Sequence, residues 1–191
     1  MQELKERIVK EGKVLPGNII KVDGFLNHRI DTGLLTRIAE EFGKYFNMDE
    51  VTMILTAEAS GIALSAIVAH HFHKPMIFAK KAKSDNIEGG LYQSDIYSYT
   101  YKKKVTLLVS KEWLSSDDKV LIIDDFMANG EAMRGLCDIV TAAGATLMGI
   151  GCAVEKGFQG GGDRLRAAGV NLKSLAIIES AEPGNIVFRD D

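Results

Sequence analysis

Short runs of consecutive apolar residues alternate along this chain with segments of helical periodicity, and this alternation limits the fold more than any other feature. The apolar runs cover residues 51–56, 75–79, 120–123, 146–154 and 175–178. The helical patterns cover residues 32–46, 62–72, 130–143 and 163–168. Strands that are apolar at every position are typical of a parallel sheet covered on both faces. We therefore predict an α/β fold, a mostly parallel open sheet with helices on both faces.

Residues 32–46 show the clearest helical pattern. Asp31 precedes them and is a favourable N-cap residue. Apolar side chains recur at intervals of three and four, at Leu34, Leu35, Ile38, Ala39, Phe42, Tyr45 and Phe46. This spacing places them on one side of a helix, so we expect that side to face the core.

Residues 80–119 interrupt the alternation of strands and helices. They begin with a polar, cationic stretch over residues 80–86, followed by glycines. Between residues 96 and 109, apolar or aromatic side chains alternate with polar ones, as in an antiparallel ribbon. The aromatic members are Tyr97, Tyr99 and Tyr101. We predict a flexible loop and a ribbon that form a small hood over an active site, with a disordered surface excursion as the alternative.

The composition fits one domain over residues 1–191. Hydrophobic residues make up 46% of the chain, which is enough for one substantial core, and no repeat divides the sequence. A formal charge of -3 gives no basic footprint for nucleic acid. The nearly apolar run over residues 62–68 is, like the other apolar runs, far shorter than the roughly 20 residues of a membrane span. Residues 1–11 are charged and contain no signal-peptide core, so we expect a cytoplasmic protein with no membrane or nucleic-acid partner.

The cysteines and clustered histidines do not form a metal motif. Cys137 and Cys152 lie in apolar stretches without a paired motif, so we expect buried, reduced thiols. His70, His71 and His73 lack the spacing and the acidic neighbour of a metal site. We expect surface or capping histidines and no protein-bound transition metal.

The most informative stretch runs from Val120 to Ala132. Four apolar residues form a buried strand, and Asp124 and Asp125 follow where we expect the strand to emerge. In open α/β sheets, ligands bind beyond the carboxyl ends of the strands. The two acids are therefore candidates for ligand binding.

A turn of small residues, Ala128-Asn129-Gly130, follows the acids and leads into a helix. The first backbone N–H groups of a helix have no partner within it, so such a turn can bind a phosphate. Gly130 can adopt a positive φ and admits close approach to the backbone. The alternative is an ordinary strand-to-helix connection in which Asp124 and Asp125 only cap the helix.

Acids beside a phosphate-binding turn need a role other than binding the phosphate. Carboxylates accept hydrogen bonds, and the 2- and 3-hydroxyls of a ribose offer two donors at a suitable spacing. Together, Asp124, Asp125 and the turn indicate a ribose 5-phosphate site.

These residues resemble the signature of the type I phosphoribosyltransferases, which bind phosphoribosyl pyrophosphate. The signature comprises four apolar residues, two acids and a small-residue phosphate turn. Asn129 and Ala132 stand where threonines are commoner, and this version is similar to that of the bacterial family members that use xanthine. The similarity extends over essentially the whole chain and includes residues 15–17, 58–61 and 154–158.

The resemblance implies a type I phosphoribosyltransferase fold in which Asp124 and Asp125 are catalytic and hold the ribose hydroxyls. It also implies phosphoribosyl pyrophosphate contacts from Ala128, Asn129, Gly130, Glu131, Ala132, Ala59, Ser60, Gly61, Lys80 and Lys81. Of the two lysines, at least one would reach the pyrophosphate. Without the resemblance, residues 59–61 fit a plain turn capped by Ser60 equally well, and the lysines fit a solvated surface.

The resemblance assigns purine contacts to Ile20, Asn27 and Lys156. The Lys156 ammonium would donate to the 6-oxo group, the Asn27 amide suits the 2-oxo edge, and Ile20 would add main-chain groups and an apolar wall. Phe158 would stack on the base. The alternatives are a surface lysine, a turn asparagine and two core hydrophobic residues.

The implied reaction transfers phosphoribosyl from phosphoribosyl pyrophosphate to N9 of xanthine. Its products are xanthosine 5'-phosphate, a purine 5'-monophosphate, and pyrophosphate. Mg2+ would arrive with phosphoribosyl pyrophosphate, without a dedicated protein site. Residues 80–103 would close over the site, and the family resemblance also implies a homodimer.

Three other functions stay open. The first is a regulator that senses phosphoribosyl pyrophosphate without catalysis. Such regulators carry an extra amino-terminal DNA-binding domain, whereas about thirty residues precede the first predicted helix here. The second is a nucleotide-binding module without catalysis, and the third is a broader guanine or hypoxanthine phosphoribosyltransferase.

Overall fold

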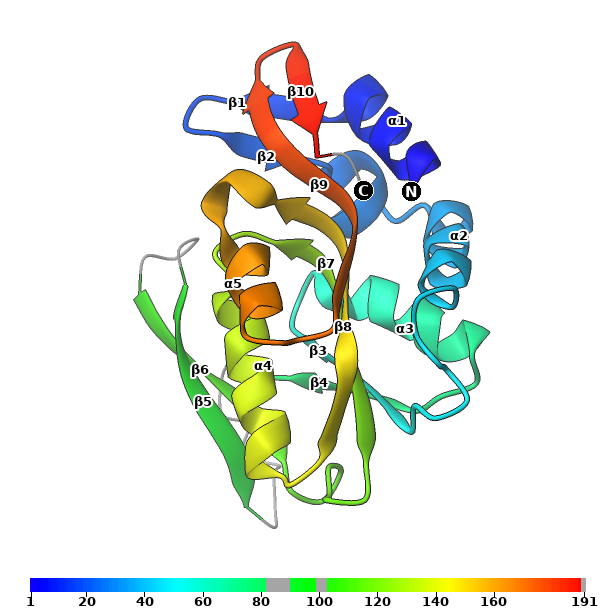
Figure 1. Cartoon of the computed structure of the whole chain (residues 1–191), viewed down its shortest axis with the longest axis vertical. Coiled ribbons are helices and arrows are strands. Elements are labelled where there is room, and N and C mark those ends of the chain that lie inside the picture. Colours follow the sequence, from blue (N-terminus) through cyan, green and yellow to red (C-terminus); the bar gives the residue numbers. More distant parts are fainter. Residues whose placement is uncertain (82–89, 99–102, 190–191) are drawn as a thin grey trace.

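A six-stranded sheet in the order β10-β9-β8-β7-β3-β4 forms the centre of the molecule (Figure 1). The computed structural model describes residues 1–81, 90–98 and 103–189. The strands are β3 (Met53–Ala57), β4 (Met76–Ala79), β7 (Lys119–Met127), β8 (Thr146–Lys156), β9 (Leu172–Glu182) and β10 (Asn185–Phe188). β10 runs antiparallel to β9, and the other described pairs in this sheet are parallel. The predicted mostly parallel sheet is confirmed.

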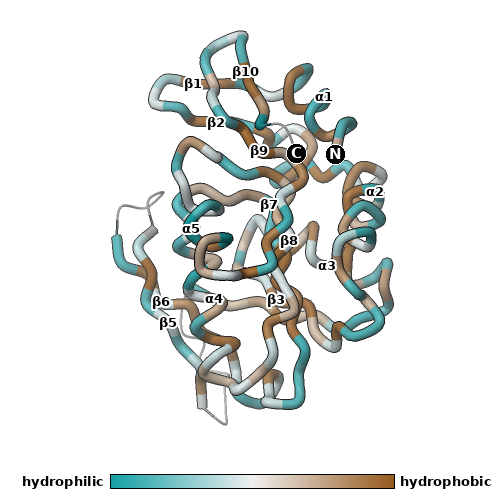
Figure 2. The backbone as a smooth tube through the Cα atoms, viewed as in Figure 1, coloured by the Kyte–Doolittle hydropathy of each residue, from teal (hydrophilic) through white to brown (hydrophobic). Residues whose placement is uncertain are grey.

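Helices cover both faces of the sheet, as predicted. α2 (Thr32–Phe42) and α3 (Gly61–His71) lie on one face, and α4 (Glu131–Ala142) and α5 (Gly161–Ala167) lie on the other (Figure 1). Successive strand side chains point to opposite faces, so Leu121 belongs to the core beneath α3 and Ile122 to the core beneath α4. The tube coloured by hydropathy shows the apolar residues gathered along these strands (Figure 2).

The structure corrects several predicted boundaries, and β9, predicted over residues 175–178, covers Leu172–Glu182. β7 continues through Asp124 and Asp125 to Met127, because it stays paired with β8 as far as Glu155. The two acids therefore lie within the strand and not beyond its end. α2 ends at Phe42 and is followed by Gly43, so the helix is shorter than the predicted 32–46.

Several elements near the amino terminus were not predicted. They are α1 (Gln2–Glu11), β1 (Lys13–Leu15), β2 (Ile19–Lys21) and a π-helical turn, η1 (Asp23–Asn27). With β10 they cap one end of the sheet, at the top of Figure 1. Leu4 and Ile8 of α1 are fully buried, and the amino group of Met1 donates to the Leu175 carbonyl at 2.6 Å.

The predicted ribbon is confirmed over its described strands, β5 (Leu91–Ser98) and β6 (Lys103–Ser110), which pair antiparallel. It packs along α4, where a Cβ at Gly135 would overlap the Ile96 methyl group. Arg134 of α4 donates to the Asp95 carbonyl at 2.8 Å. Tyr99, Tyr101 and the expected flexible loop over residues 82–89 lie outside the described residues.

Both cysteines are free thiols, as predicted, but only Cys152 is buried and Cys137 is half-buried. Burial raises the pKa of Cys137 to about 11 and raises that of Cys152 well above its ordinary value. In the described part of the chain, no helix combines the length and apolarity needed to cross a bilayer.

The side chain of Asp31 forms hydrogen bonds with both the unpredicted helix α1 and the helix α2. Its Oδ1 accepts a hydrogen bond from the backbone N–H of Leu34 at 3.0 Å, which makes it the predicted N-cap. Its Oδ2 accepts from the Arg7 guanidinium at 3.0 Å. The Leu34 N–H and the Arg7 charge hold the pKa of Asp31 below its ordinary value.

We predict that Asp31→Ala lowers the free energy of unfolding by about 1–2 kcal/mol, because α2 loses its cap and Arg7 loses a partner. This corresponds to a fall of about 2–8 °C in Tm for a chain of this length, measurable by scanning calorimetry. Asp49→Ala, which removes an exposed carboxylate from a turn, is the matched control. Equal falls in both variants would contradict the capping role.

Candidate active site

A cavity of about 260 Å³ lies at the carboxyl ends of β3 and β7. The neighbouring strands β3 and β7 lead in opposite directions across the sheet. From β3 the chain continues through α3 to β4 toward one edge, and from β7 it continues through α4 to β8 toward the other edge. Ligands bind in open α/β sheets at such a reversal of strand order. The cavity is lined by Ala57, Glu58, Ser60, Lys81, Ile96, Tyr97, Asp124, Phe126 and residues 127–133.

The predicted phosphate turn forms one wall of this cavity. Gly130 has φ +77°, the left-handed conformation predicted for it, and precedes the first residue of α4. No side chain caps this helix, so its first backbone N–H groups are available to an anion. Glu131 lines the cavity but its carboxylate is also engaged, pairing with Arg134 at 3.2 Å and accepting from the Tyr97 N–H at 3.4 Å.

The two predicted catalytic acids occupy different environments. Asp124 lines the cavity, and its Oδ1 accepts from the backbone N–H of Asp125 at 3.0 Å. Asp125 accepts from the Ser60 hydroxyl at 2.8 Å and from the Asn27 amide at 2.7 Å. One carboxylate thus borders the cavity, and the other binds protein groups.

Burial raises the pKa of Asp124 well above its ordinary value, and the neighbouring charge of Asp125 adds to this effect. Only 6% of Asp124 is exposed. A carboxylate in this position gains from any hydroxyl or cation that enters the cavity, because its charge is poorly solvated.

The predicted pyrophosphate loop lies between β3 and α3, and its Glu58–Ala59 peptide bond is cis. Gly61 leaves no room for a side chain, because a Cβ there would overlap the Asp124 carboxylate. Ser60 lines the cavity and Ala59 lines a smaller one beside it. The structure thus brings Ser60 and Gly61 together with Asp124 and places Ala59 at the neighbouring cavity.

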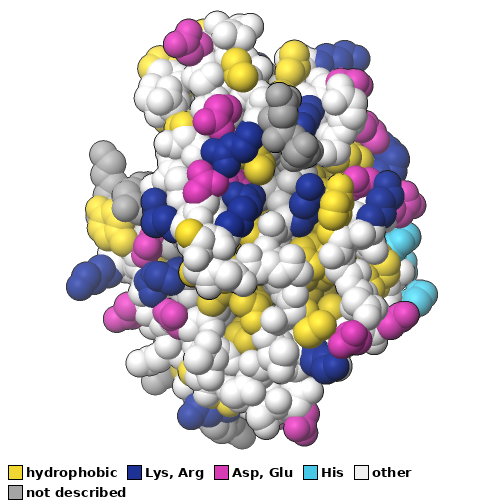
Figure 3. Space-filling model, in the orientation of Figure 1, with side chains coloured by type: hydrophobic (Ala, Val, Ile, Leu, Met, Phe, Trp, Pro, Cys, Tyr) yellow, Lys and Arg dark blue, Asp and Glu magenta, His cyan; other side chains and the backbone are white. Residues whose placement is uncertain are grey.

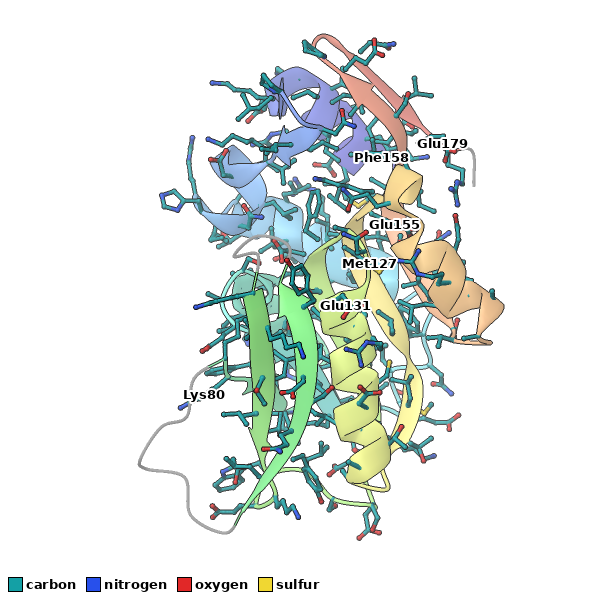
Figure 4. All side chains as sticks on the ribbon, turned by 90° about the vertical axis from the view of Figure 1, so that its left-hand side faces the viewer. Lys80, Met127, Glu131, Glu155, Phe158 and Glu179 are labelled. Atoms are coloured by element: carbon teal, nitrogen blue, oxygen red, sulfur yellow. The ribbon has the colours of Figure 1, made fainter. Side chains whose placement is uncertain are left out.

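The structure distinguishes the two candidate lysines by position. Lys81 lines the cavity, and its backbone N–H donates to the Glu58 carboxylate at 2.6 Å. Lys80 forms a backbone bridge with Leu108 and lies apart from Met127 and Glu131 in Figure 4. Lys81 is therefore the better placed of the two.

Two of the predicted purine contacts, Lys156 and Asn27, do not line the cavity but contact Phe126 and Asp125, respectively. The Lys156 ammonium lies 5.4 Å from the centre of the Phe126 ring and donates to the Asn18 carbonyl at 3.1 Å. Burial lowers the pKa of Lys156. Asn27 commits one N–H to Asp125, the residue before Phe126, which leaves its other N–H and its carbonyl oxygen for a ligand.

The other two predicted purine contacts are packed into the protein. Ile20 lies in β2 and is only 7% exposed. Phe158 lies in a short 3-10 turn, Gly157–Gln159, and packs against the core cluster of α2 and α3. Neither is among the residues that line the cavity.

Several residues of the site region were not predicted, among them the apolar lining residues Ala57, Ile96, Met127 and Met133. Glu58, Tyr97 and Phe126 line the cavity, and Glu155 is a fully buried carboxylate next to Lys156. In the sequence, Glu155 stands out as a charged residue directly after the apolar run 146–154, and this was the signal that could have identified it. Among residues 1–81, 90–98 and 103–189, no group of three or more His, Cys, Asp or Glu side chains is placed to hold a metal ion.

A family model for the phosphoribosyl transferase domain matches residues 28–168. The chain belongs to the phosphoribosyltransferase family, as the phosphate turn and the acids predicted. Solved structures agree on the fold. An adenine phosphoribosyltransferase from Giardia lamblia, complexed with 9-deazaadenine, has a TM-score of 0.75 at 20% identity, with 90% of this chain and 96% of that one covered.

Curated relatives are much closer in sequence. A xanthine phosphoribosyltransferase of Lachnoclostridium phytofermentans is 52% identical over the full length of both chains. One from Bifidobacterium longum is 53% identical, with 99% of this chain and 100% of the relative covered.

We predict that Asp124→Asn stabilises the protein at neutral pH. The raised pKa means that the folded state binds the Asp124 proton more tightly than the unfolded chain, so the wild type loses stability as pH rises above about 3.9. Asparagine carries no charge and still accepts from the Asp125 N–H. We expect the Tm of the variant relative to wild type to increase between pH 4 and pH 7.

Scanning calorimetry at both pH values measures this difference, and each 1 kcal/mol corresponds to about 2–4 °C. Asp117→Asn, which neutralises an exposed aspartate, is the control. A Tm difference that is the same at pH 4 and pH 7 would show that the Asp124 charge is not the cause.

Proposed function

We propose that this chain, as one domain, transfers the phosphoribosyl group of phosphoribosyl pyrophosphate to N9 of xanthine. The products are xanthosine 5'-phosphate and pyrophosphate, a step of purine salvage. The observation that carries this proposal is the meeting of the Gly130 turn and the buried Asp124 in one cavity. The relatives that are about half identical over the full length are named for this activity.

In this proposal the 5'-phosphate binds the backbone N–H groups of Ala128, Asn129, Gly130, Glu131 and Ala132. The ribose then lies over Asp124, whose carboxylate accepts from a ribose hydroxyl. Asp125 contributes by holding Ser60 and Asn27 in place. Fixing the ribose in this way lowers the barrier by orienting C1 toward the base.

The pyrophosphate leaves toward the loop of Ala59, Ser60 and Gly61. Lys81 lines the same cavity and supplies positive charge to the departing group. The Mg2+ that accompanies phosphoribosyl pyrophosphate supplies further positive charge to its oxygens. The carboxylates of Asp124 and Glu58 fit such an ion, since Mg2+ takes one or two carboxylates, substrate phosphates and several waters.

The purine lies between the ribose and the Lys156 side chain. The Lys156 ammonium donates to the 6-oxo group, and its lowered pKa reflects the partly buried site that the base would share. The free N–H and the carbonyl of Asn27 read the 2-oxo edge. Ile20 and Phe158 form the apolar support behind these polar groups.

Bond cleavage at C1 develops positive charge on the ribose ring. Asp124 stabilises this charge, and the low-dielectric cavity strengthens the interaction. Tyr97 and Ile96 of the ribbon form another part of the cavity wall, which helps to exclude water that would hydrolyse the sugar. We propose in addition that the enzyme acts as a cytoplasmic homodimer.

The test is a direct assay with Mg2+, phosphoribosyl pyrophosphate and xanthine, guanine or hypoxanthine, followed by measurement of pyrophosphate and nucleotide. We expect kcat/KM for xanthine to exceed that for the other bases by at least about tenfold. Replacing both Asp124 and Asp125 by Asn is expected to lower kcat by at least about 100-fold. Binding of phosphoribosyl pyrophosphate without pyrophosphate release would instead indicate a sensor.

We predict that Lys156→Ala raises KM for xanthine by at least about tenfold, because the base loses a charged hydrogen-bond donor. KM for phosphoribosyl pyrophosphate is expected to change by less than about threefold. Lys119→Ala, which removes an exposed ammonium paired with Glu50 at the amino end of β7, is the matched control. Equal weakening of both substrates would argue against Lys156 as a base contact.

A further inference from the structure

Glu155 is a fully buried carboxylate that the proposed mechanism does not use. It lies at the end of β8, opposite Met127 of β7 and near Phe158 in Figure 4. Arg166 of α5 donates to both of its oxygens, at 3.0 and 2.6 Å, and the Ser174 hydroxyl donates to it as well. Its charge is thus neutralised by one residue from α5.

The ion pair with Glu155 restricts the position of Arg166. A buried carboxylate without its cation is strongly unfavourable, so α5 can lie only where its guanidinium reaches Glu155. The two parallel bonds also fix the orientation of the guanidinium plane. The second acidic partner of Arg166, Asp163, is 49% exposed and 3.3 Å away, which makes it a weaker constraint.

Two glycines at the start of α5 bring the helix backbone into close contact with both Glu155 and the phosphate turn. A Cβ at Gly162 would overlap the Glu155 carboxylate, so the helix backbone lies directly against it. A Cβ at Gly161 would lie 2.6 Å from the Gly130 nitrogen, so the same backbone also lies against the turn. The first turn of α5 is therefore held between Glu155 and the phosphate turn.

α5 also determines which way the peptide groups of the turn point. The Arg164 guanidinium donates to the Asn129 carbonyl at 2.9 Å, and the Ala128 carbonyl faces Gly161. In a planar trans peptide the C=O and N–H groups point in opposite directions. The N–H groups of Asn129 and Gly130 therefore point away from α5. The cavity is lined by the turn and, within the described chain, by no residue of α5, so it lies on that side.

We propose that Glu155 is a positioning residue for binding of the ribose 5-phosphate group. Its ion pair with Arg166 holds the first turn of α5 against residues 128–130, with their N–H groups directed into the cavity. This inference rests on the proposed function, because it assigns the phosphate to that turn. It adds a residue that touches neither substrate.

The discriminating variant is Glu155→Gln. Glutamine has the size of glutamate and still accepts from Ser174, but it removes the charge that fixes Arg166. We expect KM for phosphoribosyl pyrophosphate and Kd for ribose 5-phosphate, measured by calorimetry, to rise at least about tenfold. KM for xanthine is expected to change by less than about threefold, because sheet pairing opposite Ile178 holds Lys156 in place.

Asp163→Asn is the matched control, since it removes the other negative charge that faces Arg166. Its constants are expected to stay within about twofold of wild type. Arg166→Lys, which keeps the positive charge but not the two parallel bonds, is the second variant and should weaken phosphate binding in the same direction. All constants are measured well below the Tm of each variant.

A purely structural role predicts a lower Tm for Glu155→Gln with unchanged constants, and that result would overturn the proposal. Equal weakening of xanthine and phosphoribosyl pyrophosphate would overturn it too. If the wild type binds ribose 5-phosphate but does not convert xanthine, the proposed function fails. The ratio of Kd values between Glu155→Gln and wild type then still decides the positioning role.

Discussion

The continued pairing of β7 with β8 is the constraint on which the site depends. β7 stays in the sheet as far as Met127, so Asp124 and Asp125 are carried into the interior and cannot turn toward solvent. Ser60 and Asn27 satisfy Asp125, whereas the hydrogen bond described for Asp124 comes from a single backbone N–H. The charge of a carboxylate that is only 6% exposed reduces stability, and Asp124 borders the cavity. The protein thus retains an unfavourable group where a ligand would relieve it.

The rest of the site consists largely of backbone groups. These groups come together only where neighbouring chain segments pack closely, without side chains between them. Gly61 lies against Asp124, and Gly161 lies against the phosphate turn, so a side chain at either position would displace a neighbour. Charged pairs lie around the Gly161 contact and hold α5 in place. Around α5 and the carboxyl end of β9, cationic and anionic side chains alternate on the surface (Figure 3), including Arg189 with Asp163 and Glu179. Of these neighbouring pairs, the one between Arg166 and the fully buried Glu155 has the least exposure to water.

Local patterns predicted the fold well where an element buries a continuous apolar face. The strands of the parallel sheet, helices α2 to α4 and the ribbon all carry such a pattern. The elements that were missed are the largely polar helix α1, the short strands β1, β2 and β10, and the π-helical turn η1. α1 buries Leu4 and Ile8 against β9 and the rest of the cap, so its stability comes from tertiary contacts that no local pattern reveals.

The sequence by itself determined the alternation of strands and helices, the order of acids and phosphate turn, and the family to which the chain belongs. Only the tertiary structure decided which side chains meet. It placed Lys81 and not Lys80 at the cavity, joined Asn27 to Asp125 across 98 positions, and paired Glu155 with Arg166. The physical reason is that periodicity reports the environment of one element at a time. Contacts between side chains depend instead on the order of the strands in the sheet and on which helix covers each face.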